Sequence, residues 1–196
     1  MKQGRPGLYV MTADGANPQP LTPSMRVREE PIWAPDGKAI AVAGEDKKGP
    51  GLFLVPMEGA PVRLYDRRCR FPLWSPDGRY ILFAEYFQGP QMHLKAVTPR
   101  GQSVSLPEIR LIVTQLPKNL TPYRFLPDGK SLVLQDGGWR TQQFFLVSMA
   151  TGERRQLTDL KTGRPIRSFD VSSDGKNILF DRVQENSDIV LIELQK

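Results

Sequence analysis

The stretch that decides the fold is IWAPDGKAIAVA at residues 32–43, because its pattern returns three more times along the chain. It recurs as LWSPDGRYILFA at 73–84, as RFLPDGKSLVLQ at 124–135 and, in weaker form, as DVSSDGKNILFD at 170–181. The aspartates of successive copies are 41, 51 and 46 residues apart, a spacing typical of propeller and solenoid repeats. The chain is therefore predicted to be a repeat protein in which no single copy forms a functional site.

The tetrad PDG[KR] has the chemistry of a tight turn. Proline presets φ at the first turn position, aspartate can accept a hydrogen bond from its own downstream backbone, and glycine tolerates the left-handed conformation. A three-residue hairpin loop with a G1 bulge needs these properties in this order. We therefore expect a positive φ at four glycines: Gly37, Gly78, Gly129 and Gly175.

Four carboxylates at matched positions could also form a ring of metal ligands. Two of them could act as a general acid and base, because glycosidases use a pair of carboxylates in catalysis. Equivalent positions in different repeats of a ring lie far apart, however. We assign the turn aspartates no catalytic role, and we predict no metal site and no cofactor.

A second set of glycines divides each repeat into two hairpins. These are Gly15, Gly59, Gly101 and Gly152. Each of the last three follows the preceding turn glycine by 22 or 23 residues, so each repeat is a four-stranded antiparallel meander, with strands that we call A to D. The repeats are a partial unit at 7–22 and units at 26–66, 67–106, 122–158 and 166–194 of one domain spanning 1–196. Blades of this kind predict an all-β fold, a β-propeller of about four to five repeats.

Large apolar residues recur in strand A, three residues before each turn aspartate. They are Trp33, Trp74, Phe125 and Val171. In a propeller this position packs between neighbouring blades, where burial of a large side chain contributes roughly 2–3 kcal/mol. We therefore predict that all four belong to the core.

The tetrad after a tryptophan, the I-x-F pattern of strand B and the Leu-Thr ending, as at Leu157–Thr158, resemble the TolB-type or WD40-like (PD40) β-propeller repeat. The resemblance covers residues 7–194. This repeat occurs in the periplasmic TolB family and in propeller sensor domains of bacterial serine/threonine kinases and winged-helix regulators, and the ending at 169–194 is especially similar to those of the kinases. The resemblance implies a propeller that acts as a non-catalytic binding or sensor scaffold. Ser173 in place of proline, Phe125–Leu126 in place of Trp-Ser and the long segment 106–122 depart from the pattern.

The sequence leaves two alternatives for how the propeller ring closes. Residues 8–22 supply only strands C and D, and the last unit contains A, B and C. Either Gln19–Thr22 completes the last blade and closes a ring of four, or the chain is part of a larger propeller of six or seven blades. In the second case exposed strand edges favour association with another copy or with missing blades.

Composition limits the partners and the compartment. The sequence begins without an apolar signal segment and has no stretch long enough to span a membrane. As written the chain is expected to be cytoplasmic, and periplasmic or extracytoplasmic if it belongs to a longer parent. The net charge of +6 raises nucleic acid as a partner, but acidic residues are interleaved on the same loops, and we predict no nucleic-acid binding.

The loops D–A and B–C lie on one face of a propeller, and here they combine basic and aromatic residues. Such a mixture suits anionic groups and protein surfaces. The predicted partner-binding residues are Arg67, Arg68, Arg70, Tyr86, Phe87, Trp139 and Arg140. The partner is expected to be a protein, with a small-molecule ligand as the other possibility.

Catalysis has little support in the sequence. There is no G-x-S-x-G elbow, and His93, the only histidine, is expected on strand C. Cys69 lies among arginines that could lower its pKa and make it reactive. The alternative function is a propeller enzyme of the lactonase or lyase type with a site at the channel mouth. The innermost strands offer a single acid, Asp170, for such a site, so we predict a binding scaffold rather than an enzyme.

Overall fold

The computed structural model describes residues 7–22, 24–86, 89, 91–112, 121–138, 140–161 and 163–182, and every regular element within these ranges is a β-strand. An N-terminal hairpin is formed by β1 (Tyr9–Val10) and β2 (Gln19–Pro20). The first blade contains β3 (Arg26–Val27), β4 (Ile32–Trp33), β5 (Ala39–Asp46), β6 (Gly49–Pro56) and β7 (Val62–Tyr65).

The later blades follow in chain order. The second contains β8 (Cys69–Trp74), β9 (Ile81–Tyr86), β10 (Gln91–Val97), β11 (Ser103–Val104) and β12 (Arg110–Ile112). The third contains β13 (Tyr123–Phe125), β14 (Ser131–Asp136), β15 (Gln143–Ser148) and β16 (Arg154–Gln156). The described part of the fourth contains β17 (Phe169–Val171) and β18 (Ile178–Phe180). All strand pairs are antiparallel.

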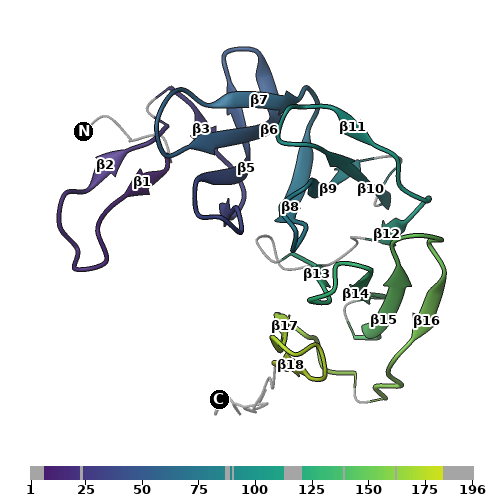
Figure 1. The fold of residues 1–196 in the computed structure, drawn as a ribbon. Coiled ribbons are helices and arrows are strands. Elements are labelled where there is room, and N and C mark those ends of the chain that lie inside the picture. Colours follow the sequence, from purple (N-terminus) through teal and green to yellow (C-terminus); the bar gives the residue numbers. More distant parts are fainter. Residues whose placement is uncertain are drawn as a thin grey trace, which may run out of the picture.

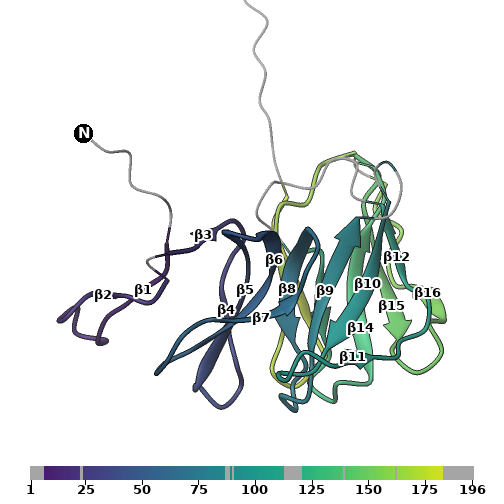
Figure 2. The ribbon, with the colours of Figure 1, turned by 90° about the horizontal axis from the view of Figure 1, so that it is seen from above.

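The blades follow one another along an open arc (Figure 1), with β8 and β13 on its inner side and β11 and β16 on its outer side. Figure 2 shows the second and third blades side by side and the N-terminal hairpin beyond the first blade. This is a partial β-propeller of antiparallel meanders, as predicted. No described residue belongs to a helix that is long and apolar enough to cross a membrane.

The N-terminal hairpin packs on the first blade and does not complete the last one. Leu8 shares a buried cluster with Val42 and Phe53 of the first blade, and its backbone N–H donates to Thr22 Oγ1 at 2.8 Å. Ring closure through Gln19–Thr22, one of the two sequence-based alternatives, is therefore wrong for this structure, because β2 pairs with β1 beside the first blade.

The PDG turns have the predicted geometry. Gly37, Gly78, Gly129 and Gly175 have φ of 69°, 69°, 68° and 71°. In the first blade the Gly37 N–H donates to the Ala34 carbonyl at 2.9 Å, and the Lys38 N–H donates to Asp36 Oδ1 at 2.9 Å. The same pair of bonds occurs in the other three turns, so the aspartates form turns, as expected.

The strand-A aromatic residues do not all belong to the core. Trp74 is 7% exposed, packs among Ala34, Ala41 and Ala43 of the first blade, and donates from Nε1 to the Ile32 carbonyl at 3.2 Å. Trp33, at the matching position one blade earlier, is 51% exposed. The prediction that it is buried is wrong, because among the described residues a two-stranded hairpin, and not a complete blade, lies before the first blade.

The segment between the second and third blades contributes one strand that the repeat pattern does not predict. Near its end β10 pairs with β11, whereas at its beginning it pairs with β12. The outer strand of the second blade is thus divided in two. Residues 113–120 of this segment lie outside the described residues.

A candidate binding groove lined by arginines

A groove of about 480 Å³ lies between the first and second blades, where their D–A and B–C loops meet. It is lined by Arg26, Val27, Arg28, Glu29, Gly44, Pro50, Gly51, Arg68, Cys69, Arg70 and Tyr86. We call it the arginine groove, because four of these residues are arginines and Glu29 is the only acid among them. Its volume is within the range of ligand pockets.

The base of the groove contains an ion pair that joins the two blades. Arg70 Nε donates to Glu29 Oε1 at 2.8 Å, and the two side chains are only 15% and 11% exposed. The Arg70 guanidinium also lies over the Phe71 ring, 4.2 Å from its centroid. Burial raises the pKa of Glu29, and the hydrogen bond and charge of Arg70 oppose this effect in part. The pair therefore holds Arg70 in one position.

The backbone next to Arg70 has an unusual conformation. Phe71 is buried and has a φ of 56°, which is a genuine outlier for a bulky residue. The pairing of β8 with β9 shifts register between Arg70 and Leu73. Tyr123 of the third blade stabilises the irregularity, because its buried hydroxyl donates to the Phe71 carbonyl at 2.5 Å. Such outliers persist only where the surrounding structure enforces them, and they occur frequently at functional sites.

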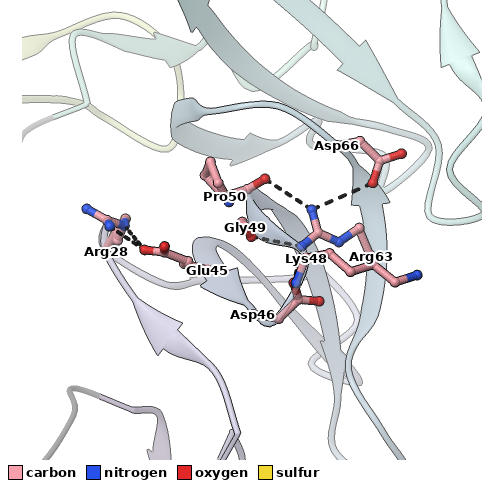
Figure 3. Close-up of polar contacts among 8 residues, drawn as sticks. All are labelled: Arg28, Glu45, Asp46, Lys48, Gly49, Pro50, Arg63 and Asp66. Atoms are coloured by element: carbon pink, nitrogen blue, oxygen red, sulfur yellow. Dashed lines mark hydrogen bonds and ion pairs between the residues drawn. The ribbon is translucent and has the colours of Figure 1, made fainter.

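Gly44, Pro50 and Gly51, at the adjoining ends of β5 and β6, form part of the rim of the groove, and Figure 3 shows the turn that joins the two strands. Arg63 donates to the carbonyls of Pro50 at 3.0 Å and Gly49 at 2.8 Å and forms an ion pair with Asp46, which ties this turn to β7. The Lys48 N–H also donates to Asp46 Oδ1 at 2.7 Å. These hydrogen bonds and the ion pair therefore hold the turn between β5 and β6 in place at the rim.

Glu45 lies at the same rim and is surrounded by positive charge. Arg28 Nε donates to it at 3.0 Å (Figure 3). The pKa of Glu45 is lowered chiefly by hydrogen bonding and charge from Arg28, with smaller contributions from the charges of Arg26 and Arg68. Among the described residues, no carboxylate lies within ion-pairing distance of the guanidinium of Arg26 or Arg68. Both side chains are exposed, and the groove has an excess of positive charge.

The structure brings together three of the residues predicted from sequence. Arg68, Arg70 and Tyr86 line the arginine groove. Arg67 directly precedes Arg68 in the sequence, but its side chain is exposed and forms an ion pair with Glu85 at 3.3 Å. Arg140 is on the loop between β14 and β15 of the third blade and does not line the groove. Phe87 and Trp139 lie outside the described residues.

Eight of the lining residues were absent from the predicted set, among them the charged residues Arg26, Arg28 and Glu29. A signal for one of them was present in the sequence. Glu29 and Arg70 are 41 residues apart, which is the spacing of the first two turn aspartates. They occupy the same position in successive blades.

The cysteine and the histidine are in different environments. Burial, together with the charges of Glu29 and Glu85, raises the pKa of Cys69 to about 12. The expectation that neighbouring arginines lower it is wrong, because the thiol is buried while the flanking Arg68 side chain is exposed. His93 is on β10, with Nε2 4.0 Å from Glu108 Oε1. Within the described ranges, no three residues among His, Cys, Asp and Glu cluster closely enough to hold a metal ion.

Comparison with known proteins defines the class of fold. No family model matches the chain. TolB from Acinetobacter baumannii superposes with a TM-score of 0.65 at 22% identity, over 89% of this chain and 42% of that one. A TolB-type protein from Agrobacterium tumefaciens gives 0.64 at 23% identity, over 93% and 68% of the two chains. The chain has the fold of a TolB-type β-propeller.

Two further similarities are to proteins named as enzymes. The chain is 30% identical over 166 residues to a Bacillus subtilis protein named as the uncharacterized peptidase YuxL, a match that covers 82% of this chain and 22% of that protein. Oligogalacturonate lyase from Vibrio parahaemolyticus superposes with a TM-score of 0.57 at 15% identity, over 87% of this chain and 46% of that one. The chain thus spans about a fifth of the length of its peptidase-named relative.

Proposed function

We propose that the chain is a non-catalytic binding scaffold whose arginine groove binds an acidic segment of a protein partner. The observation that carries the proposal is the excess of arginine over acid around one inter-blade groove. Opposite charge at an interface gives specificity and speeds association.

The arrangement of the arginines supports a division of roles. Arg70 is held by Glu29 and by the Phe71 ring at the base, whereas Arg26 and Arg68 have exposed side chains at the groove. A guanidinium presents a planar fork of donors that matches a carboxylate. Arg26 and Arg68 are therefore positioned to bind incoming carboxylates, and Arg70 shapes the base beneath them.

Tyr86 supports a protein as the partner. Its ring is 44% exposed at the groove, and tyrosine and arginine are enriched at the energetic centres of protein interfaces. A peptide with alternating acidic and apolar side chains would use both kinds of contact. A small anionic ligand would use the arginines alone.

The test is fluorescence anisotropy of a fluorescein-labelled decaglutamate peptide titrated with the purified chain. We expect binding that weakens with added salt and that becomes at least tenfold weaker in the double variant Arg26→Gln/Arg68→Gln. Arg140→Gln/Arg67→Gln removes the same charge outside the groove lining and is the matched control, with an expected change below twofold. Equal weakening in both variants would show that binding depends on net charge alone and would overturn the proposal.

A second peptide separates the two kinds of partner. Replacing alternate glutamates by leucine should tighten binding through Tyr86, and Tyr86→Ala should remove that gain while leaving decaglutamate binding unchanged. If inorganic phosphate or free glutamate competes at micromolar concentration, the groove is instead a site for a small anion.

The absence of catalysis is also part of the proposal. It is supported by the raised pKa of Cys69, the only thiol at the groove, and by a lining that contains no histidine. The peptidase and lyase names belong to proteins of which this chain matches less than half. Incubation with peptide p-nitroanilides and with oligogalacturonate should yield no product above buffer, and turnover by the purified chain would support the propeller-enzyme alternative.

A further inference from the structure

The outer strand of the second blade leaves its neighbour β10 for part of its length. β11 pairs with the end of β10 and β12 with its beginning (Figure 2). Between these two pairings β10 has two residues, whereas the outer strand has five, 105–109. Pairing resumes where the Leu94 N–H donates to the Ile109 carbonyl at 3.0 Å. Residues 105–108 therefore form a bulge. The third blade has no such bulge in its outer strand, since β15 and β16 pair without interruption.

The bulge is held in place by its own apolar residues and by the third blade. Leu106 packs against the buried cluster that contains Ile109. Pro107 and the Glu108 carbonyl lie against the turn at Gly152 of the third blade. A Cβ added there would be 3.1 Å from Pro107 Cβ and 3.5 Å from the Glu108 carbonyl oxygen. The departure from β10 is therefore fixed by the packing of the two blades.

A cavity of about 450 Å³ lies at the bulge. It is lined by the bulge, by β10 and by Tyr65 of the first blade, and its apolar wall includes the rings of Tyr65 and Phe83, whose centroids are 4.7 Å apart. The volume is within the range of ligand pockets. We call it the outer cavity. It shares no lining residue with the arginine groove, so the two are separate.

The charges of the outer cavity favour an anion. Its one acidic lining residue, Glu108, accepts hydrogen bonds from Arg110 Nε at 3.0 Å and from Arg110 Nη2 at 2.8 Å. Hydrogen bonding and charge from Arg110 are the largest causes of the lowered pKa of Glu108, so this carboxylate is ionised and already paired. Lys95 also lines the cavity and is exposed. Among the described residues, no carboxylate lies within ion-pairing distance of its ammonium.

Hydroxyl groups lie on the same side of the blade as the lysine. Lys95 is opposite Phe83 in the pairing of β10 with β9, and Val97, two residues further on, is opposite Ser103 of β11. Residues two apart in a strand point to the same face, so Lys95 and Ser103 share a face with the Phe83 ring. Ser105 follows two residues later and also lines the cavity. An ammonium and hydroxyl donors are suited to bind a carboxylate.

We propose that the outer cavity binds a small organic carboxylate with an aromatic or branched apolar body. The carboxylate binds the Lys95 ammonium and the hydroxyls of Ser103 and Ser105, and the apolar body packs on the Tyr65 ring. A monocarboxylate matches the single ammonium, whereas a phosphate dianion would bring a second negative charge close to Glu108. This site does not depend on the binding of an acidic segment at the arginine groove.

The test is titration of the full 196-residue chain with phenylacetate, followed by the NMR signals of its backbone amides. We expect saturable shifts at Lys95 and at residues 103–109. Lys95→Met keeps a long side chain, removes the charge and should weaken binding at least tenfold. Lys130→Met removes the same charge from an exposed turn outside the lining and should change the affinity less than twofold. Equal weakening in the two variants, or the absence of saturable shifts at millimolar phenylacetate, would overturn the proposal.

Two analogues separate the carboxylate from the apolar body. Phenylacetamide has the ring without the charge and acetate has the charge without the ring, so each should bind at least tenfold more weakly than phenylacetate. Ser103→Ala/Ser105→Ala should weaken binding of phenylacetate more than binding of phenylacetamide. Acetate that binds as tightly as phenylacetate would contradict the role of the rings.

A variant of the arginine groove tests whether the two sites are distinct. Arg26→Gln/Arg68→Gln should leave phenylacetate binding unchanged. Shifts confined to amides of the arginine groove, or lost in this variant, would show that the probe binds the groove and would overturn the assignment to the outer cavity.

Discussion

Pro127 Cδ lies 3.0 Å from the point where a Cβ on Gly175 would stand, although the two residues belong to the turns of different blades. The corresponding distance is 3.5 Å from Pro76 to Gly129 and 3.8 Å from Pro35 to Gly78. Gly175 is thus under two constraints, a positive φ and the proline ring of the preceding blade, whereas a Cβ on Gly78 or Gly129 would make an ordinary van der Waals contact with that ring. The PDG turn shapes its own hairpin and also contributes to the contact with the next one.

Replacement of these glycines by alanine separates the two constraints. Gly37→Ala introduces only the left-handed conformation, which costs roughly 1–2 kcal/mol, because no heavy atom lies within 4 Å of the added Cβ. Gly175→Ala has nearly the same φ and also contacts a rigid ring, so its loss should be larger by about 1 kcal/mol or more. Urea unfolding measures both losses, and equal losses would show that the turns do not support one another.

Tyr123→Phe should loosen the base of the arginine groove. The variant removes the hydroxyl that donates to the Phe71 carbonyl and leaves a buried acceptor without its partner, at a cost of about 1–3 kcal/mol. Because Phe71 follows Arg70, we expect weaker binding of acidic peptide as well as lower stability. Tyr80→Phe is the control, since that ring is only partly buried. Unchanged stability in Tyr123→Phe would contradict the conclusion that the Tyr123 hydroxyl stabilises the backbone at Phe71.

Cys69 should be slow to alkylate in the folded protein. Raising the pKa from 9.0 to about 12 lowers the thiolate fraction at pH 8 roughly a thousandfold, since each pKa unit is a factor of ten. Mass spectrometry should show little labelling by iodoacetamide under native conditions and rapid labelling in urea. Equal rates in the two conditions would indicate an accessible, reactive thiol.

Ser75→Ala should change the acid titration of the second turn. The Ser75 hydroxyl donates to Asp77 Oδ1 at 2.7 Å and is the largest cause of the lowered pKa of that carboxyl. A lowered pKa in the folded state contributes stability that is present above the unfolded-state pKa and is lost as the pH falls. The stability difference between wild type and variant should therefore narrow below about pH 4. In NMR titrations Asp77 should move toward its ordinary pKa, whereas Asp174, which has its own serine partner, should not move.

Much of the fold is encoded locally and was predictable. The turn of Pro35, Asp36 and Gly37 is specified by residues that are adjacent in sequence, and the hydrogen bonds that define it join residues at most five apart. Repetition of this turn, together with period-two alternation in the strand that follows it, was sufficient to predict antiparallel meanders. β12 escaped prediction because Arg110–Ile112 has no counterpart in the other repeats and pairs with only the beginning of β10.

The candidate site was predictable only in part, because it is formed between blades. Arg68, Arg70 and Tyr86 could be assigned to one face from strand order alone. Whether a charge there is compensated depends on the curvature of the arc, which places Glu29 against Arg70. The positive φ of Phe71 likewise results from packing and from the Tyr123 hydroxyl, since phenylalanine has no local preference for that conformation.

The sequence by itself determined the repeat, the turns and the all-β class, since these follow from steric preferences and hydrogen bonds between near neighbours. Only the tertiary structure decided which tryptophan is buried, which arginines lack a carboxylate within ion-pairing distance and why the pKa of the thiol is raised. Those properties depend on desolvation and Coulomb interactions between groups distant in sequence. Trp33 and Trp74 occupy the same position in the repeat, but only Trp74 has a complete blade behind it.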